Sequence, residues 1–381
     1  MTTTAKKTTT SRRAERWRSE VARVAHAIHA NLLWILLAVY ALAALVPGPG
    51  LALRTVTLGR LSLGASDASP HLDLSLPALL LAVLLFNAAL GVDVVDALRL
   101  VKRPKVLTFG LLANITVPLL ITVAASGLLG IWHDADEIHA LLVGLALVAA
   151  MPIAGSSTAW AQNANGNMAL SVGLVLFSTV LSPLLTPLAF HVVAAVTSGD
   201  YADDLIELAG GDAQLFLAVA VVVPSMLGML AHRLIGRVRL ERAKPVIKLV
   251  NLLVILTLNY SNGSVALPRV LTAPDPDLMA LLVGITAAMV ALDFTAGRGL
   301  GRVLGAGKPE RTSLTYALGM NNNGTGLVLA ATALGDHPNV ILTIVIYNLV
   351  QQIVAGAFGQ LSQRRSGAVD GEPGLPVGAG G

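Results

Sequence analysis

Residues 151–167, MPIAGSSTAWAQNANGN, and residues 316–326, YALGMNNNGTG, place a polar cluster beside helix-disfavouring Pro or Gly inside long apolar segments. A backbone group without a hydrogen-bond partner in hydrocarbon costs several kcal/mol, so irregular backbone at that depth survives only where it is buried in protein or lines a cavity. The two stretches therefore predict discontinuous membrane helices, and the interpretation of the rest of the chain follows from them.

The composition of the chain is that of a membrane protein. Of its 381 residues, 13% are charged and 55% are hydrophobic, and the mean hydropathy is +0.73. An average soluble domain carries roughly 25% charged residues, so a soluble globular protein is excluded. The chain contains no Cys, which excludes a disulfide scaffold, a Cys-ligated zinc site and any mechanism that needs a thiolate.

Ten apolar windows are long enough to cross about 30 Å of hydrocarbon. They lack the strict alternation of barrel strands, so their backbone must be satisfied within helices. We expect an all-α polytopic membrane protein with ten transmembrane helices. The windows are residues 31–47, 75–92, 106–130, 138–162, 167–196, 213–231, 246–268, 278–297, 312–334 and 338–362.

Basic residues concentrate in alternate connections between these windows. All but three of the 26 Lys and Arg residues lie on one predicted side, the exceptions being Arg54, Arg60 and Arg269. The positive-inside rule then places both termini in the cytoplasm, in a multi-pass protein of the plasma or inner membrane. We interpret residues 1–30 as a basic cytoplasmic leader and residues 366–381 as a disordered cytoplasmic tail. Charges placed in this way give no indication of a nucleic-acid partner.

The two polar interruptions lie about 165 residues apart, each in the fourth window of a set of five. The chain therefore divides into two five-helix repeats, residues 31–198 and 199–365. An odd number of spans per repeat inverts the second repeat relative to the first, as in many secondary transporters. Discontinuous helices in matching places indicate the binding site.

Residues of good N-cap type open the second half of each broken helix. Two half-helix N-termini that meet near the midplane would present N–H groups and positive dipole ends, which favours an anionic substrate. Freed carbonyls, hydroxyls and amide oxygens suit a small hard cation. Alternatively, both segments are kinks healed by Ser, Thr and Asn hydrogen bonds. The capping candidates are Ser156, Ser157 and Thr158 after Gly155, and Asn321, Asn322 and Asn323 after Gly319.

Three stretches resemble the bile acid:sodium symporter family: GSSTAWAQNANGNMALSVGLVLFSTVLSPLLTPL at 155–188, LGMNNNGTGLVLA at 318–330 and KRPKVLTFGLLANITVPLL at 102–120. The resemblance covers nearly the whole membrane part. It implies a core domain of helices 3–5 and 8–10, a panel of helices 1, 2, 6 and 7, and crossed broken helices 4 and 9. It also implies sodium as the coupling ion.

The resemblance implies two sodium sites, with one serious departure. The family's Glu on the ninth helix is replaced by Ala317, which removes the only carboxylate from both sites. Thr158 stands for the family's Asn, and Val175 for a Thr. The implied ligands are Ser157, Thr158 and Ser171 at the first site, and Asn114, Asn321 and the carbonyls of Leu318 and Met320 at the second.

Candidate substrate contacts come from the half-helix starts, from the resemblance and from the polar TLNYSNGS stretch of the seventh window. Residues of that stretch either line the cavity or pack on a neighbouring helix. The polar residues of the tenth window cannot all share one face of a helix, so there we nominate only the face that carries Asn348. The candidates are Gly155, Ser156, Asn322, Asn323, Asn348 and Asn259.

Asp293 is the one acid clearly inside a predicted span. At the bilayer centre it would cost about 2.5 to 3.5 kcal/mol on insertion scales. Because the eighth span runs from outside to inside, we expect Asp293 near its cytoplasmic end, in an interfacial ion pair with Arg298 or another basic loop residue. A proton-carrying role is the alternative.

Enzymatic signatures are missing from the sequence. The stretch GLGRVLGAGKPE at 299–310 lacks a Walker A pattern, and there is no HExxH motif. We therefore expect no enzyme but a secondary-active transporter, a sodium-coupled symporter of an organic anion that works by alternating access. Because of Ala317, a proton-coupled or uncoupled anion carrier of the same fold is the alternative, and a non-transporting receptor or scaffold is a further one. The expected partners are a small organic anion and membrane lipid.

Overall fold

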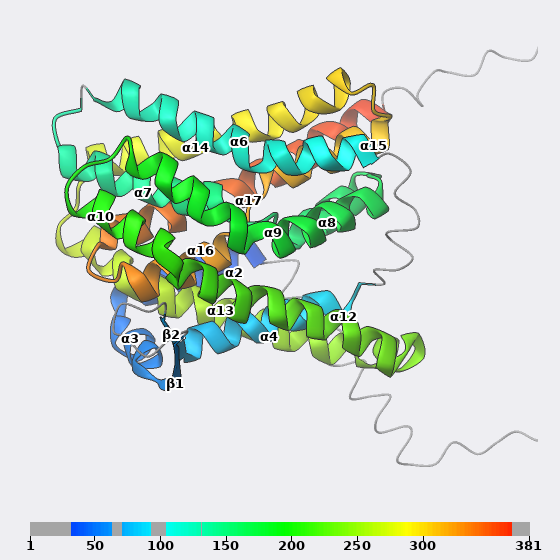
Figure 1. The fold of residues 1–381 in the computed structure, drawn as a ribbon, viewed down its shortest axis with the longest axis horizontal. Helices are drawn as coiled ribbons and strands as arrows, with labels where there is room; N and C mark the ends of the chain where they lie inside the picture. The colour runs from blue at the N-terminus through cyan, green and yellow to red at the C-terminus, as the bar shows by residue number, and fades with distance from the viewer. Residues whose placement is uncertain (1–31, 63–70, 93–103, 131, 368–381) are drawn as a thin grey trace, which may run out of the picture.

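The chain folds into long helices that lie roughly parallel to one another, with α6 and α14 along one side and α4, α12 and α13 along the other (Figure 1). This arrangement confirms an all-α polytopic membrane protein. The predicted leader, 1–30, and residues 368–381 of the predicted tail lie outside the described residues. The computed structural model describes residues 32–62, 71–92, 104–130 and 132–367.

The helices begin and end close to the predicted windows, with short helices where a window is interrupted. Two short π-helical stretches, Leu208–Asp212 and Leu217–Val222, separate α10, α11 and α12. The elements are α2 Leu32–Leu45, α3 Pro47–Thr55, β1 Thr57–Ser62, β2 His71–Ser75, α4 Leu76–Leu90, α6 Pro104–Leu129, α7 Ala135–Ala150, α8 Ser156–Asn163, α9 Met168–Ala194, α10 Asp200–Glu207, α11 Ala213–Phe216, α12 Val223–Ile235, α13 Arg237–Thr272, α14 Pro276–Val303, α15 Lys308–Gly319, α16 Asn323–Ala333 and α17 Pro338–Gly367.

Within the described ranges, six helices are individually long and apolar enough to cross a membrane. A seventh span results if α2 and α3, bent by 88° at their junction, are taken together. The bend falls at Pro47, which has no N–H to continue the ladder of α2 and starts a new helix instead. The fourth and ninth predicted windows are each divided into two short helices, so a length criterion does not count them. Ten spans therefore remains a prediction.

The helices pack in two groups. The crossover bundle consists of α6, α7, α8, α9, α14, α15, α16 and α17, and the side bundle of α2, α3, α4, α12 and α13. Close backbone approach holds each group together, as is usual between membrane helices. A Cβ on Gly297 would lie 2.4 Å from the Leu314 carbonyl oxygen, and one on Gly228 would lie 2.3 Å from that of Phe86. Neither glycine therefore tolerates a side chain without moving a helix.

Two features of the fold differ from the sequence-based expectation. The connection between the first two windows contains an antiparallel hairpin of β1 and β2, in which Arg60 forms an ion pair with Asp73 at 2.7 Å. The sixth window, predicted as 213–231, is preceded by the unpredicted helix α10. The helical run from Asp200 to Ile235 is kinked at Gly211, whose φ of 138° is not helical, just before the predicted start of the window.

Candidate functional site

Both predicted interruptions are confirmed in the structure. Helix α7 ends at Ala150 and α8 begins at Ser156, while α15 ends at Gly319 and α16 begins at Asn323. We call residues 151–155 the first break and residues 320–322 the second break. Helix α7, which leads into the first break, is buried from Ala140 to Ala150. The interruption thus lies deep inside the crossover bundle.

The two breaks cross and satisfy one another's backbone. Ile153 and Asn321 form an isolated antiparallel bridge between segments that are far apart in sequence. Such pairing supplies the partners that irregular backbone inside a membrane requires. The hydrogen bonds run from the Ala154 amide to the Met320 carbonyl and from the Asn322 amide to the Pro152 carbonyl, at 2.8 Å each.

Side chains from other helices complete the backbone hydrogen bonding of the crossing. The Ile153 amide donates to Ser178 Oγ at 3.1 Å, and the Thr186 hydroxyl donates to the Ala150 carbonyl at 2.8 Å. Gln351 of α17 accepts from the Asn321 amide at 3.0 Å and donates to the Asn321 carbonyl at 3.2 Å. The pairing of the two breaks favours discontinuous, crossed helices over the alternative in which both segments are only kinks healed by Ser, Thr and Asn hydrogen bonds.

Gln351, which hydrogen-bonds the second break, was not among the predicted site residues. It lies on α17 four residues after Tyr347, on the face that turns toward the crossing rather than on the Asn348 face, and its side chain is 1% exposed. The sequence feature that could have indicated Gln351 was its i, i+4 spacing from another polar residue, Tyr347, inside an apolar helix.

Capping differs between the two half-helices. Asn322 caps α16, because its side chain accepts from the Thr325 amide at 3.3 Å, as the sequence predicts. The N-cap of α8 is Gly155, and no side chain caps that helix. The expected cap from Ser156, Ser157 or Thr158 is wrong, because these residues lie inside the first turn, where the Thr158 hydroxyl donates back to the Gly155 carbonyl at 2.7 Å.

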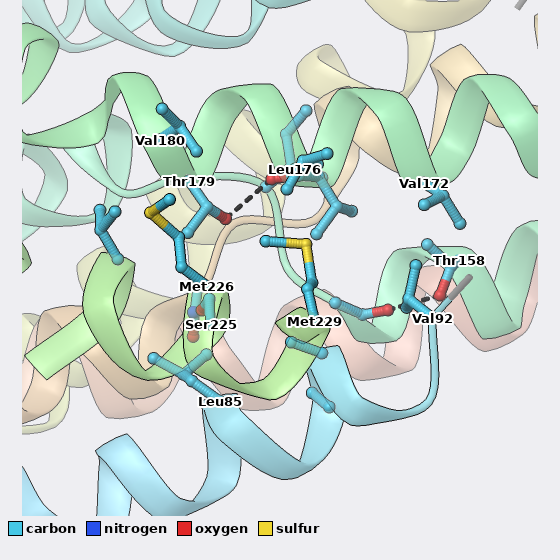
Figure 2. Close-up of a pocket in the computed structure, with 17 residues that line it drawn as sticks. Leu85, Val92, Thr158, Val172, Leu176, Thr179, Val180, Ser225, Met226 and Met229 are labelled. Carbon is cyan, nitrogen blue, oxygen red and sulfur yellow. Dashed lines mark hydrogen bonds between the residues drawn. The ribbon is translucent and has the colours of Figure 1, made fainter. Parts of the chain in front are cut away.

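A cavity of about 120 Å³ lies between the two bundles, where the breaks meet α4, α9 and α12. Its walls are mainly apolar, and Figure 2 shows Met226 and Met229 of α12 projecting toward α9. Polar groups come from Gly155 and Thr158, from Asn322 of the second break, and from Thr179 of α9 and Ser225 of α12. The space is therefore mainly apolar, with polar groups on several of its walls (Figure 2).

Of the nominated substrate residues, Gly155 and Asn322 line this cavity. Ser156 is exposed but is not among its lining residues. Asn323 lies inside the protein instead, only 2% exposed, and its side-chain amide has no hydrogen-bond partner.

Asn259 and Asn348 meet away from this cavity, at Tyr40 of α2. The Tyr40 hydroxyl donates to Asn259 Oδ1, and Asn348 Nδ2 donates to the Tyr40 oxygen at 3.4 Å. For Asn259 the structure thus favours the packing alternative over the cavity-lining one. The cluster joins α17 of the crossover bundle to α2 and α13 of the side bundle.

Several buried oxygens on α6 and α9, in the second break and on α16 have no hydrogen-bond partner. A buried polar atom without a partner carries a desolvation penalty of about 1 to 3 kcal/mol, which a bound cation would offset. Neutral oxygens of this kind are ligands for a small hard cation, so the residues fit sodium in chemical type. The unpartnered oxygens are Asn114 Oδ1, Ser171 Oγ, Asn321 Oδ1, Asn323 Oδ1 and Thr325 Oγ1.

Three of these five residues, Asn114, Ser171 and Asn321, were implied as ligands by the family resemblance, and Thr325 was missed. The sequence feature that could have indicated Thr325 was its place in the polar NNNGTG run. Among the other implied ligands, Ser157, Leu318 and Met320 are buried, and the Met320 carbonyl already accepts one hydrogen bond. Thr158 is half-buried and faces the cavity.

No carboxylate stands at the position that carries the family's Glu. Ala317 is 1% exposed and packs in an apolar cluster with Leu314, Leu318 and Ile153. Across the described part of the chain, no group of three or more His, Cys, Asp or Glu side chains is placed to hold a metal ion. Any cation at the crossing would therefore be held by neutral oxygens.

Asp293 lies buried inside the helix bundle. Its side chain is 0% exposed, and the Tyr347 hydroxyl donates to Asp293 Oδ2 at 3.2 Å. The expected ion pair with Arg298 is wrong, because α14 continues as far as Val303 and turns Asp293 inward toward α17.

Comparisons with known proteins agree with this geometry. A family model described as the sodium bile acid symporter family matches residues 78–267, which include the first break but not the second. The chain is 30% identical to YbaS of Bacillus subtilis over 224 residues, which are 58% of this chain and 69% of that protein. It is 24% identical to the Bacillus subtilis protein named sodium-dependent transporter YocS over 272 residues, 69% of this chain and 77% of YocS. It is 27% identical to PA2026 of Pseudomonas aeruginosa over 234 residues, 59% of this chain and 66% of that protein.

Proposed function

Because the chain belongs to the sodium bile acid symporter family and is a transporter of that type, we propose that it carries a small amphipathic organic anion together with sodium. The observation that supports this proposal best is the cavity between the bundles. Gly155 and Asn322 of the two breaks line it together with Thr158, and most of the remaining wall is apolar. The hydroxyls of Thr179 and Ser225, which also line it, donate to carbonyls of their own helices.

The form of the cavity favours an amphipathic substrate. Met226, Met229 and Leu85 offer apolar surface, while Thr158 and Asn322 offer polar contacts beside the starts of α8 and α16. The N-terminal ends of these helices carry partial positive charge, which stabilises an anion. A carboxylate or sulfonate group would bind at the breaks and its hydrocarbon body would lie along α12 and α4.

Sodium would bind beside the crossing, with Thr158 at the boundary between the first ion site and the cavity. The ligands we propose are the neutral oxygens of Ser157, Thr158 and Ser171 at one site and those of Asn114, Leu318, Met320 and Asn321 at the other. Since Ala317 supplies no charge, the anionic substrate would supply the negative charge that the ion lacks, and this mutual attraction couples the two. A membrane potential of 100 mV adds about 2.3 kcal/mol per net charge moved.

Alternating access would occur by movement of the two bundles against each other. We propose ten spans in two inverted five-helix repeats, 31–198 and 199–365, with both termini in the cytoplasm. The crossover bundle would be the core and the side bundle the panel. Contacts of α13 with α17 and of α4 with α16 form part of the surface between them.

Reconstitution into proteoliposomes tests the proposal. A panel of organic anions, neutral sugars and organic cations is offered with an inward sodium gradient, and with the same gradient of choline. We expect uptake of an amphipathic anion that depends on sodium. A panel that returns only cations or sugars would contradict the anion assignment.

A proton-coupled or uncoupled anion carrier is the second candidate, favoured by the uncharged apolar surroundings of Ala317. Equal uptake in sodium and in choline would establish it. A proton-coupled carrier would then respond only to a pH gradient, whereas an uncoupled carrier would respond to neither gradient. Binding of an anion without any counterflow would instead indicate a receptor or scaffold.

A further inference from the structure

Asp293 is a carboxylate buried in the crossover bundle to which neither the sodium sites nor the cavity gives a role. It lies on the face of α14 that also carries Gly297, where α14 packs directly on α15. Its side chain is 0% exposed, and the next residue, Phe294, is equally buried. An ionisable residue inside a membrane bundle indicates a function rather than a packing role.

The hydrogen bonding of Asp293 is incomplete. Oδ2 accepts from the Tyr347 hydroxyl, whereas Oδ1 has no partner. Within the described residues, the charged or titratable groups on the helices packed against it do not form an ion pair with it. These groups are Asp277, Arg298 and Arg302 on α14 itself, Lys308, Glu310, Arg311 and Tyr316 on α15, Tyr347 on α17 and Lys105 on α6.

A carboxylate in this position is unfavourable as an anion. Burying a charge without a partner costs several kcal/mol even after relaxation, whereas the neutral acid avoids most of that cost. A hard metal cation needs about six oxygen ligands, and the contacts of Asp293 supply one neighbouring hydroxyl, that of Tyr347. The ligand that fits this pair is a proton.

We propose that Asp293 and Tyr347 form a proton-binding site that is occupied in the conformation described here and exchanges its proton during the transport cycle. In the exchange the carboxylic O–H bond breaks, the proton passes to a water molecule admitted when the helices separate, and the carboxylate that remains keeps the Tyr347 hydrogen bond. Occupancy of the site stands independently of the proposed function, whereas its exchange during transport rests on that function.

The site is connected to the crossing through two of its neighbours. Gln351, which binds both backbone groups of Asn321, follows Tyr347 by one turn of α17. The ring of Phe294 lies so close to Gly319 that a Cβ there would be 2.1 Å from it. Deprotonation of Asp293 would therefore affect Gly319, the last residue of α15, through Phe294, and the second break through Tyr347 and Gln351. We expect sodium binding at the crossing to change the proton occupancy of Asp293.

Infrared spectroscopy of the full-length protein in detergent tests occupancy directly. We expect a protonated carboxyl C=O band at neutral pH that shifts in D₂O and disappears in Asp293→Asn. The control is Asp277→Asn, the same substitution at the exposed start of the same helix, which keeps the band. Tyr347→Phe retains the acid but removes its donor, so the band shifts to higher frequency. A band that is absent from the wild type, or unchanged in Asp293→Asn, would overturn the proposal.

Linkage is tested by adding NaCl, or choline chloride as control, to weakly buffered protein with a pH-indicator dye. We expect a sodium-specific change in proton occupancy in the wild type and in Asp277→Asn, and its loss in Asp293→Asn. The same signal in Asp293→Asn, or no signal despite sodium-dependent thermal stabilisation, would overturn the linkage. Absence of both sodium stabilisation and signal would reject sodium coupling itself, while the infrared band would still decide occupancy.

Discussion

The two breaks cross at one point but are built differently. The first break contains Pro152, ends in the exposed Gly155 and opens a half-helix that no side chain caps. In the second break, Met320 and Asn321 are buried, and the half-buried Asn322 caps the following half-helix and lines the cavity. Both breaks therefore reach the cavity, but the second also carries buried side-chain oxygens without partners and is bound by Gln351. We infer that the first break mainly serves the substrate and the second mainly serves the ion and the integrity of the crossing.

The strongest test of this difference is Gln351→Ala. It leaves the Asn321 amide buried without a partner, at about 1 to 3 kcal/mol. It also removes one of the two hydrogen bonds of the Asn321 carbonyl, which still accepts from the Asn323 amide at 2.9 Å. We expect a large fall in the thermal stability of the detergent-solubilised protein and loss of transport. Asn348→Ala, on the same helix, removes one hydrogen bond of 3.4 Å from a half-buried side chain and is the matched control. Equal destabilisation by both variants would show that the second break does not depend on Gln351.

The role of the second break in ion binding is tested by Asn321→Ala. Both polar atoms of this side chain are buried without partners, so its removal should not destabilise the protein in sodium-free buffer. We expect the sodium concentration that gives half-maximal thermal stabilisation to rise at least tenfold, equivalent to about 1.4 kcal/mol. Ser156→Ala, in the first turn of α8 after the first break, should leave the sodium titration unchanged. An unaltered titration in Asn321→Ala would exclude its amide as a ligand.

The difference in capping predicts a smaller effect. Asn322→Ala removes the side-chain cap of α16 and should cost about 1 kcal/mol of stability. Ser156→Ala should change stability by less than about 0.5 kcal/mol, because Ser156 does not cap α8. Thermal unfolding of the two variants in the same detergent compares them. A larger loss for Ser156→Ala would reverse the assignment of the caps.

The smallest predicted effect concerns the apolar wall beside the first break. Met226→Ala removes surface that lines the cavity, and should weaken binding of an amphipathic anion about threefold to tenfold, since each buried methylene contributes about 0.8 kcal/mol. A short hydrophilic anion should bind the variant as it binds the wild type. Leu230→Ala, one turn along α12 and outside the lining, is the control for competition binding. Equal loss for both anions would argue against an apolar subsite.

Much of the fold and part of the site could be predicted because their signals are local. The polar runs at 151–167 and 316–326 predicted both breaks, and the three successive Asn residues included the cap of α16. The burial of Asp293 could not be predicted, since a hydropathy window places a residue along a span but not around its axis. Gln351 and Thr325 were missed for the same reason, and α10, which lies before the kink at Gly211, was hidden by its acidic residues.

By itself, the sequence determined that the chain is a helical membrane protein with two interrupted helices, because hydropathy, proline, glycine and capping preferences act over a few residues. Only the tertiary structure decided that Ile153 pairs with Asn321, that Gln351 holds the second break and that Asp293 meets Tyr347. Each of these contacts joins helices far apart in the chain. Their partners are selected by the requirement that buried polar groups be satisfied across helix interfaces, and that requirement has no signature in either segment alone.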